Sequence, residues 1–187
     1  DKGWAMYKFK VVLMGDGGVG KTTLRKRFMG EGFRATYIMT IGADFAAKTI
    51  EVDGRQMRFI IWDLAGQPHF KQVRKAFYVG AVGGLLVYDV TRRETFEHIP
   101  CWLEEFISNC GRRRDAVAAV LIGNKVDLRE SARNAISPEE GAEMRDLLAE
   151  QYGIPLDFVE TSAKTGENVE KAFVMLAQEL LRLGIAT

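Results

Sequence analysis

Short hydrophobic runs alternate with segments of helical periodicity along the chain. Six runs predict strands: residues 9–14, 45–52, 56–62, 84–89, 117–122 and 158–161. Two of them, 84–89 (GLLVYD) and 117–122 (VAAVLI), are uninterrupted, which is typical of central strands covered on both faces. The pair Asp53-Gly54 predicts a hairpin between the second and third runs, because glycine adopts positive φ easily. The pattern therefore predicts a three-layer α/β fold with a six-stranded, mostly parallel sheet, one antiparallel edge strand and helices on both faces.

Apolar residues recur at helical spacing between these runs, as at 21–29 and 96–107. Pro100 falls inside the second segment, and we expect the regular helix to begin there, because the first turn needs no N–H from that position. Ser137 is followed by a proline and two glutamates, which predicts another helix start. Asn168 is expected to cap the closing helix.

Composition and length favour one domain, residues 6–187. Residues 1–5 precede the first methionine, and we expect them to be a cloning remnant outside the fold. A formal net charge of +1 gives no reason to expect nucleic acid or an anionic membrane as the main partner. No apolar run approaches the ~20 residues of a membrane span. Cys101 and Cys110 lack metal-binding or redox spacing and are expected to be free thiols in the cytoplasm.

Residues 15–22 form a phosphate-binding motif of the type G-x-x-x-x-G-K-[ST], placed between a predicted strand and a predicted helix. They read Gly15-Asp16-Gly17-Gly18-Val19-Gly20-Lys21-Thr22. In such a loop, glycines let backbone N–H groups converge on phosphate oxygens, and the helix N-terminus adds partial positive charge. We expect Lys21 to bridge the β- and γ-phosphates, Thr22 to bind Mg²⁺ through its hydroxyl, and the adjacent Thr23 to complete the phosphate-binding segment.

A second motif follows the third predicted strand. Asp63 lies at the strand's end, where a carboxylate could hold Mg²⁺ through a water molecule. Gly66 could donate its N–H to a γ-phosphate, and Gln67 could orient an attacking water. We therefore assign catalytic roles to Lys21, Gly66 and Gln67.

Two later motifs predict a guanine site. Asp127, in Asn124-Lys125-Val126-Asp127, can accept from both the ring N–H and the exocyclic amine of guanine, whereas adenine presents no such pair of donors. Asn124 is expected to tie loops together, and the stem of Lys125 to cover one face of the base. A further loop begins Thr161-Ser162-Ala163-Lys164, where Ser162, Ala163 and Lys164 are nucleotide-binding candidates and the Ala163 N–H would face guanine O6.

These motifs occur in the order found in small GTPases, and the chain resembles the Ras superfamily over residues 7–183. The resemblance implies four further roles. Phe33 would pack on the guanine edge, and Tyr37 would close over the phosphates. Thr40 would complete the Mg²⁺ sphere and take part in catalysis by sensing the γ-phosphate. Gly17 would leave room for the catalytic glutamine.

Within the superfamily, residues 40–45 (TIGADF) and 62–67 (WDLAGQ) are most similar to the Rab family. Residues 123–127 (GNKVD) resemble Ran, and residues 138–141 (PEEG) are similar to Rho. A prokaryotic relative of Rab would also fit.

Three features depart from these relatives. Rab and Ran usually have Thr and Glu where this chain has Leu64 and Pro68. Because proline restricts the preceding residue, we expect Pro68 to hold Gln67 in an extended conformation and to slow hydrolysis. The chain also ends without the cysteines that are prenylated in Rab, Rho and Ras. Peripheral membrane association is therefore expected only if a lipidated tail has been removed.

The resemblance implies a monomeric molecular switch in trafficking or signalling. It would bind GTP or GDP with Mg²⁺ and hydrolyse GTP slowly, at about 10⁻⁴ s⁻¹ unaided in such sites and ~10⁵-fold faster with an activating protein. Effectors, an exchange factor and an activating protein would bind switch I (residues 33–45) and switch II (residues 63–78). Two alternatives remain open: a GTP-binding module with negligible hydrolysis, and a P-loop kinase or ATPase that uses ATP.

Overall fold

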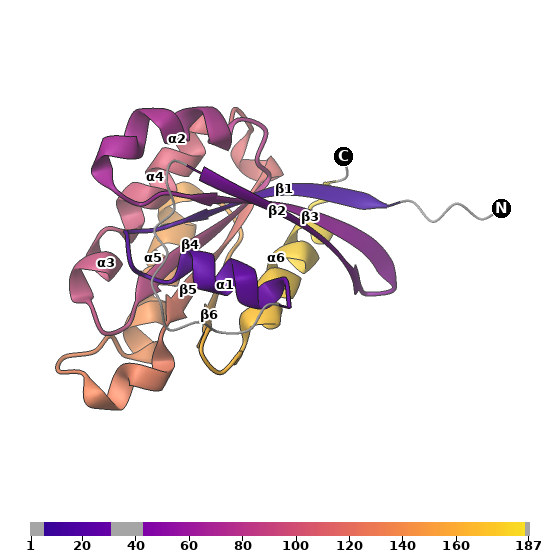
Figure 1. Cartoon of the computed structure of the whole chain (residues 1–187). Helices are drawn as coiled ribbons and strands as arrows, with labels where there is room; N and C mark the ends of the chain where they lie inside the picture. The colour runs from indigo at the N-terminus through magenta and orange to yellow at the C-terminus, as the bar shows by residue number, and fades with distance from the viewer. Residues whose placement is uncertain (1–5, 31–42, 186–187) are drawn as a thin grey trace.

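The computed structural model describes residues 6–30 and 43–185, and its centre is a six-stranded sheet (Figure 1). The strands are β1 (Tyr7–Met14), β2 (Ala43–Val52), β3 (Arg55–Leu64), β4 (Gly83–Asp89), β5 (Ala118–Asn124) and β6 (Leu156–Glu160). They are ordered β2-β3-β1-β4-β5-β6. Only the β2–β3 pair is antiparallel, so the predicted antiparallel edge strand is β2.

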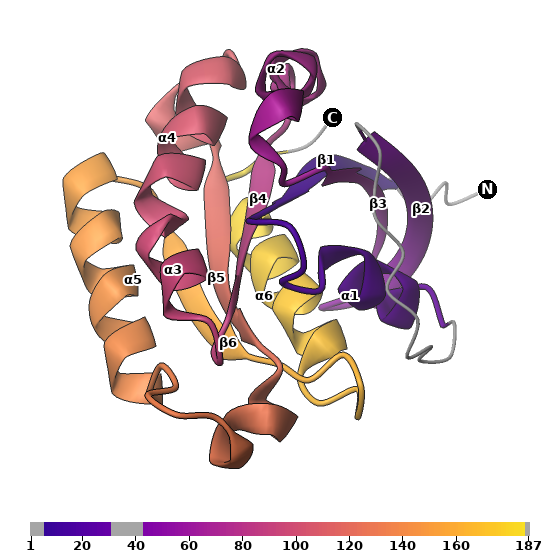
Figure 2. The same ribbon diagram turned by 60° about the vertical axis from the view of Figure 1, so that its left-hand side comes forward.

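Six helices accompany the sheet among the described residues. They are α1 (Lys21–Phe28), α2 (Lys71–Tyr78), α3 (Arg93–Glu97), α4 (Ile99–Asn109), α5 (Pro138–Tyr152) and α6 (Val169–Arg182). Figure 2 shows α1 and α6 on one side of the sheet and the others on the opposite side. One core cluster joins the sheet to α1 and α6 through Phe28 and Phe173, whose rings stack. The second joins it to α4 and α5 through Phe106 and Leu148. The predicted three-layer α/β fold is therefore confirmed.

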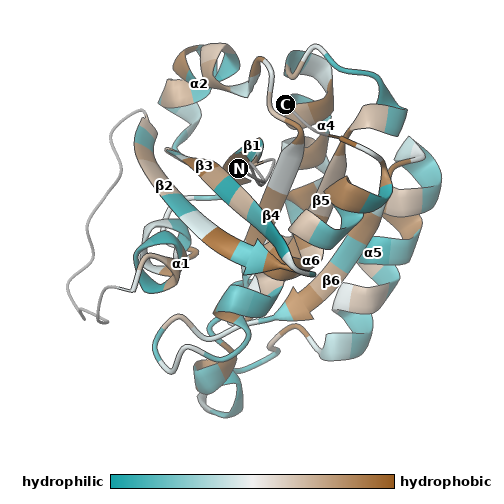
Figure 3. Ribbon diagram, turned by 90° about the vertical axis from the view of Figure 1, so that its right-hand side faces the viewer, coloured by the Kyte–Doolittle hydropathy of each residue, from teal (hydrophilic) through white to brown (hydrophobic). Residues whose placement is uncertain are grey.

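Burial explains the hydrophobic pattern. Every residue of β4 and of β5 is buried, which is why both runs are uninterrupted in the sequence. Figure 3 shows hydrophobic colours along the central strands and many hydrophilic residues on the outward sides of the helices. In the described part of the chain, no helix combines the length and the apolar character needed to cross a bilayer.

Helix boundaries follow the predicted signals with two differences. Ser137 caps α5 in a complete capping box. The Ser137 hydroxyl accepts from the Glu140 N–H, and the Glu140 carboxylate accepts from the Ser137 N–H. Pro100 lies in the first turn of α4, but that helix begins one residue earlier and is preceded by the separate short helix α3. Asn168 occupies the N-cap position of α6, as predicted, but its side chain makes no cap bond. It donates instead to the Glu160 carbonyl at 2.9 Å, which joins the loop to β6.

The hairpin between β2 and β3 turns at Asp53 and Gly54, both at positive φ (50° and 75°), as the sequence predicts. The parallel strands all end at the opposite side of the sheet. There the loops after β1, β3, β4, β5 and β6 meet, and all of them except the loop after β4 carry predicted nucleotide motifs.

Candidate nucleotide-binding site

The phosphate loop, residues 15–20, connects β1 to α1 and needs glycine at two close contacts. A Cβ on Gly15 would lie 2.2 Å from the Val87 carbonyl oxygen of β4. A Cβ on Gly20, whose φ is +101°, would lie 2.4 Å from the amide nitrogen of Asn124. The loop is thus pressed against the ends of β4 and β5, which only a residue without a side chain permits at these positions.

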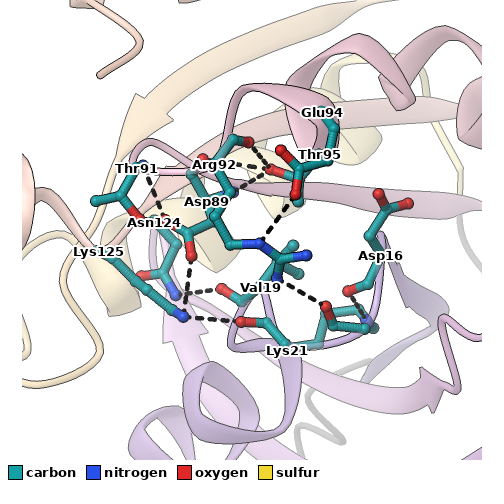
Figure 4. A network of polar contacts seen from close by, with 12 residues as sticks. Asp16, Val19, Lys21, Asp89, Thr91, Arg92, Glu94, Thr95, Asn124 and Lys125 are labelled. Atoms are coloured by element: carbon teal, nitrogen blue, oxygen red, sulfur yellow. Dashed lines mark hydrogen bonds and ion pairs between the residues drawn. The ribbon is translucent and has the colours of Figure 1, made fainter. Parts of the chain in front are cut away.

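Side chains from outside the loop hold its carbonyl groups (Figure 4). Arg92 donates to the Gly17 carbonyl at 3.1 Å, Lys125 to that of Gly18 at 2.8 Å, and the Asn124 amide to that of Val19 at 2.9 Å. Within the described residues, the backbone N–H groups of Gly17, Gly18 and Gly20 have no hydrogen-bond acceptor. Buried or half-buried donors normally have partners, so this set fits an anionic group such as a phosphate chain.

Lys21 brings a buried positive charge to the same loop. Its side chain donates to the carbonyls of Gly15 and Asp16 at 2.7 and 2.9 Å, and only 6% of the residue is exposed. Burial lowers the pKa of Lys21 to about 8, although Asp63 and Asp16 act in the opposite direction. A phosphate group close to this ammonium would favour its charged form, so the site is electrostatically suited to an anion.

The candidate magnesium ligands lie together. The Thr22 hydroxyl donates to a carboxylate oxygen of Asp63 at 2.5 Å, and Asp63 is fully buried at the end of β3. Burial raises the pKa of Asp63, while Thr22, Lys21 and Arg25 counteract this shift. A hydroxyl and a carboxylate are hard oxygen ligands of the kind that Mg²⁺ takes together with phosphate oxygens, so both residues fit the ion.

Gly66 and Gln67 begin the segment after β3 and contact the phosphate loop. A Cβ on Gly66 would lie 2.3 Å from the Gly15 carbonyl oxygen and 2.5 Å from the Gly17 nitrogen. Gln67 is extended (φ −69°, ψ 141°), in agreement with the restriction expected from Pro68. Its amide nitrogen lies 3.3 Å from the position of a Cβ on Gly17, and its amide oxygen is buried without a partner among the described residues. The glutamine side chain therefore points toward the loop.

The candidate base-binding loops are joined to one another. Thr161 donates its hydroxyl to Asn124 at 2.9 Å, and Ser162 donates to the Asp127 carboxylate at 2.8 Å. Lys125 has positive φ (68°), which turns its side chain back over the phosphate loop, where it also pairs with the buried Asp89 at 3.0 Å. Asp127 is thus held by Ser162, and it belongs to the same segment as Asn124 and Lys125, which contact the phosphate loop.

The remaining predicted residues divide into two groups. Ala163 is buried next to Ser162, Lys164 is exposed one position further, and Thr23 lies in the first turn of α1. Phe33, Tyr37 and Thr40 lie outside the described residues, as does most of the predicted switch I.

Three residues that contact the phosphate loop were not found from the sequence: Arg92, His98 and Trp102. Asp16 accepts from the indole N–H of Trp102 at 2.9 Å, and its other carboxylate oxygen contacts the His98 ring at 2.5 Å. Arg92 donates a hydrogen bond to the Gly17 carbonyl. These side chains come from the turn after β4 and from α4, where no motif marks them. The apolar stripe identified Trp102 only as a core residue, although its N–H needs an acceptor when buried.

The site therefore combines a phosphate loop with a buried lysine, a hydroxyl–carboxylate pair, and an aspartate held beside them. These parts stand at the carboxyl ends of parallel strands, where α/β proteins bind nucleotides. A comparison with protein families is consistent with this geometry. The family model described as the Ras family matches residues 10–182, nearly the whole chain, and the protein therefore belongs to the Ras family.

Proposed function

We propose that this Ras family protein is a guanine-nucleotide switch that binds GTP or GDP with Mg²⁺ and hydrolyses GTP slowly. One observation carries the proposal. Asn124 and Lys125 hold the phosphate loop, while Asp127, in the same segment after β5, is held by Ser162. A carboxylate that could select guanine therefore belongs to a segment that contacts a loop suited to phosphates.

In the proposed reaction, the water oxygen bonds to the γ-phosphorus, and the bond from this phosphorus to the bridging oxygen breaks. GDP leaves with that oxygen, and the proton of the water passes to the released phosphate or to solvent. The ammonium of Lys21 and the loop N–H groups would stabilise the charge that develops on the leaving oxygens. Gln67, with the carbonyl of Thr40, would position the water in line. Magnesium bound at Thr22 and Asp63 would neutralise phosphate charge. After the γ-phosphate leaves, Thr40 and Gly66 would lose their contacts with it, and both switch segments would become looser.

A second function, a GTP-binding module with negligible hydrolysis, is favoured by the conformation of Gln67. Pro68 removes αR geometry from the residue that should orient water, since Gln67 is extended. We expect Pro68→Glu to raise the single-turnover rate of GTP hydrolysis by about tenfold, as one positioned group commonly contributes that much or more. Equal rates for the variant and the wild-type protein would contradict this account of Pro68. His69→Ala, at the adjacent exposed position, is the matched control and should leave the single-turnover rate unchanged.

Partner proteins would bind the switch segments, and a partly exposed aromatic row, formed by Phe45, Trp62 and Phe77, supports this proposal. The rings of Phe45 and Trp62 are 5.2 Å apart, and those of Trp62 and Phe77 are 5.0 Å apart. Phe45 is 51% exposed although it is a large hydrophobic residue. Exposed aromatic residues of this kind are common anchors in protein interfaces. The row spans β2, β3 and α2, next to the nucleotide site, where an effector could distinguish the GTP and GDP states.

Within the family, we propose a Rab-like protein, on the basis of residues 40–45 and 62–67. A role in trafficking or signalling, with an exchange factor and an activating protein, follows from that resemblance. We propose the cytoplasm as its location. The free thiols of Cys101 and Cys110 suit a reducing compartment.

The proposed function is tested by the nucleotide that the protein carries. Mass spectrometry of the purified protein should find GDP or GTP. After the ligand is removed, guanine nucleotides should bind at least ~10³-fold more tightly than adenine nucleotides. Phosphate release from GTP then measures turnover, and Lys21→Ala should abolish it. Equal or tighter binding of ATP would overturn the proposal and would favour a P-loop kinase or ATPase.

A further inference from the structure

Arg92 belongs to none of the nucleotide motifs, yet its guanidinium contacts the phosphate loop. Its Nη1 atom donates to the Gly17 carbonyl at 3.1 Å and would lie 3.1 Å from a Cβ on Gly18. Its Nε atom pairs with Glu94 at 3.2 Å, on the side away from the loop. Figure 4 shows the side chain extending from the turn after β4 toward the loop.

The turn that carries Arg92 is held by buried groups. The backbone N–H of Arg92 donates to the Asp89 carbonyl at 3.0 Å, and the Thr95 hydroxyl donates to the Arg92 carbonyl at 2.7 Å. Asp89 and Thr95 are both buried. The Asp89 carboxylate also pairs with Lys125 at 3.0 Å. One buried turn thus positions two cations on two consecutive carbonyls of the phosphate loop.

The hydrogen bond from Arg92 orients the peptide group between Gly17 and Gly18. In a trans peptide the C=O and the N–H point in opposite directions, so holding the Gly17 carbonyl from one side directs the Gly18 N–H to the other. That N–H has no acceptor within the described residues. A charged donor on the carbonyl also polarises the peptide and strengthens its N–H as a donor.

The neighbours of Gly17 indicate which part of a nucleotide this N–H would meet. Gly17 lies beside Gly66 and Gln67, whereas the carbonyls of Gly18 and Val19 are held by Lys125 and Asn124 of the base-binding loop. The Gly18 N–H therefore lies toward the end of the phosphate chain that is farther from the base.

We propose that Arg92 is a positioning residue that directs the Gly18 N–H onto the terminal phosphates and so slows nucleotide release. The inference rests on the proposed function, since it needs a bound guanine nucleotide. Arg92 acts through the Gly17 carbonyl and is not a catalytic residue. Because its side chain is 42% exposed, the contribution is moderate.

The test compares GDP release from the full chain in excess Mg²⁺ for the wild-type protein, Arg92→Ala and Arg92→Lys. Arg92→Ala should release GDP about threefold to tenfold faster, the loss expected for one charge-assisted hydrogen bond in a partly exposed site. Arg92→Lys should restore part of the slow release, because lysine can still donate to one carbonyl. The dissociation constant for GMP, which lacks the terminal phosphates, should be the same in all three proteins. A general loss of structure would weaken GMP binding too.

The matched control is Arg93→Ala. Arg93 is adjacent in the chain but pairs with Glu140 at 2.7 Å, away from the phosphate loop, and its removal should leave GDP release unchanged. Equal release from Arg92→Ala and Arg93→Ala would overturn the role of Arg92 while wild-type GDP binding still supports the proposed function. If Arg92→Ala does not fold, Arg92→Met decides, because methionine has no donor for the Gly17 carbonyl. GDP release from Arg92→Met as slow as from the wild-type protein would overturn the proposal. Failure of the wild-type protein to bind GDP would overturn both.

Discussion

Individual charged residues at the site are held by neighbours from different loops, and Asp127 is the clearest case. Its carboxylate accepts from the Ser162 hydroxyl at 2.8 Å, while the rest of the residue faces solvent. The neighbouring Asn124 and Lys125 are fixed to the phosphate loop. In the proposed guanine site, base selection would therefore depend on the charge of Asp127.

Asp127→Asn should weaken binding of GDP and GTP by ~10²-fold or more, because the amide replaces one acceptor by a donor that faces the guanine N–H groups. The measurement is the dissociation constant for GDP in excess Mg²⁺. Asp146→Asn, an exposed residue of α5 that pairs with Arg145, should bind GDP like the wild-type protein. A variant of Asp127 with unchanged affinity would contradict the role given to this residue.

Residues whose role depends on a tertiary contact were the hardest to find from the sequence. The phosphate loop, Asp63, Gln67 and Asp127 belong to local motifs. Arg92 and Trp102, in contrast, contact the phosphate loop only because the fold brings the turn after β4 and α4 to the end of β1. No spacing along the chain contains that information.

At the scale of elements, a buried ion pair joins α2 to α4. Arg74 pairs with Glu105 at 3.0 Å, and both side chains are more than nine-tenths buried. Arg74 also donates to the carbonyls of Ala65 and Gln67 at 3.0 and 2.9 Å, and its guanidinium lies over the Trp102 ring. The Tyr78 hydroxyl donates to Glu105 as well. The segment before α2 is therefore fastened to α4 through one arginine.

Arg74→Met should lower the free energy of unfolding by about 3–5 kcal/mol, because Glu105 remains buried without its partner. Urea unfolding in excess GDP and Mg²⁺ measures this change. The double variant Arg74→Met/Glu105→Gln should recover much of the loss, since the amide carries no charge and still accepts from Tyr78. If the double variant is as unstable as the single one, the backbone contacts of Arg74, and not the ion pair, determine the stability.

The start of α5 should make stability depend on pH. Hydrogen bonds from Arg93 and from the Ser137 N–H lower the pKa of Glu140 from 4.5 to about 2. Because the folded-state pKa is lowered, the contribution is complete above the unfolded value near 4.5 and is lost as the pH falls toward 2. Glu140→Gln should therefore be less stable than wild type at pH 7, with a difference that disappears near pH 2. Thermal unfolding of both proteins between pH 7 and pH 2 measures this difference. A difference in stability that does not change with pH would contradict the lowered pKa of Glu140.

Elements were predicted well where local signals agree with tertiary packing. The Asp53-Gly54 hairpin and the Ser137 capping box follow from residue types alone. Asn168 is at the predicted N-cap position, but its amide bonds a nonlocal partner, the Glu160 carbonyl of β6, in place of the helix N-terminus. The start of α4 differs from the prediction by one residue, within the usual uncertainty of helix ends.

For the whole molecule, the site lies where loops from five strands meet, so ligand binding and folding should be coupled. Loops after β1, β4 and β5 are joined by the contacts of Arg92, Asn124 and Lys125. A ligand that binds only the folded protein adds to its stability in proportion to the logarithm of its concentration.

GDP with Mg²⁺ at 100 times its dissociation constant should therefore raise the free energy of unfolding by about 2.7 kcal/mol, whereas ADP should have no effect. Removing Mg²⁺ with a chelator should reduce the stabilisation, because the carboxylate of Asp63 and the phosphates would then repel each other. Thermal unfolding at several ligand concentrations tests this coupling. Stabilisation by ADP equal to that by GDP would contradict the guanine site.

The hairpin turn of β2 and β3 lies at the end of the sheet opposite to the phosphate loop (Figure 1). Asp53 and Gly54 are exposed, and a Cβ on Gly54 would meet no atom within 4 Å. A fluorescent dye or a short affinity tag could therefore be attached at this turn without crowding the nucleotide or the aromatic row. The protein could then be immobilised or followed by fluorescence while the candidate nucleotide site and the aromatic row stay accessible.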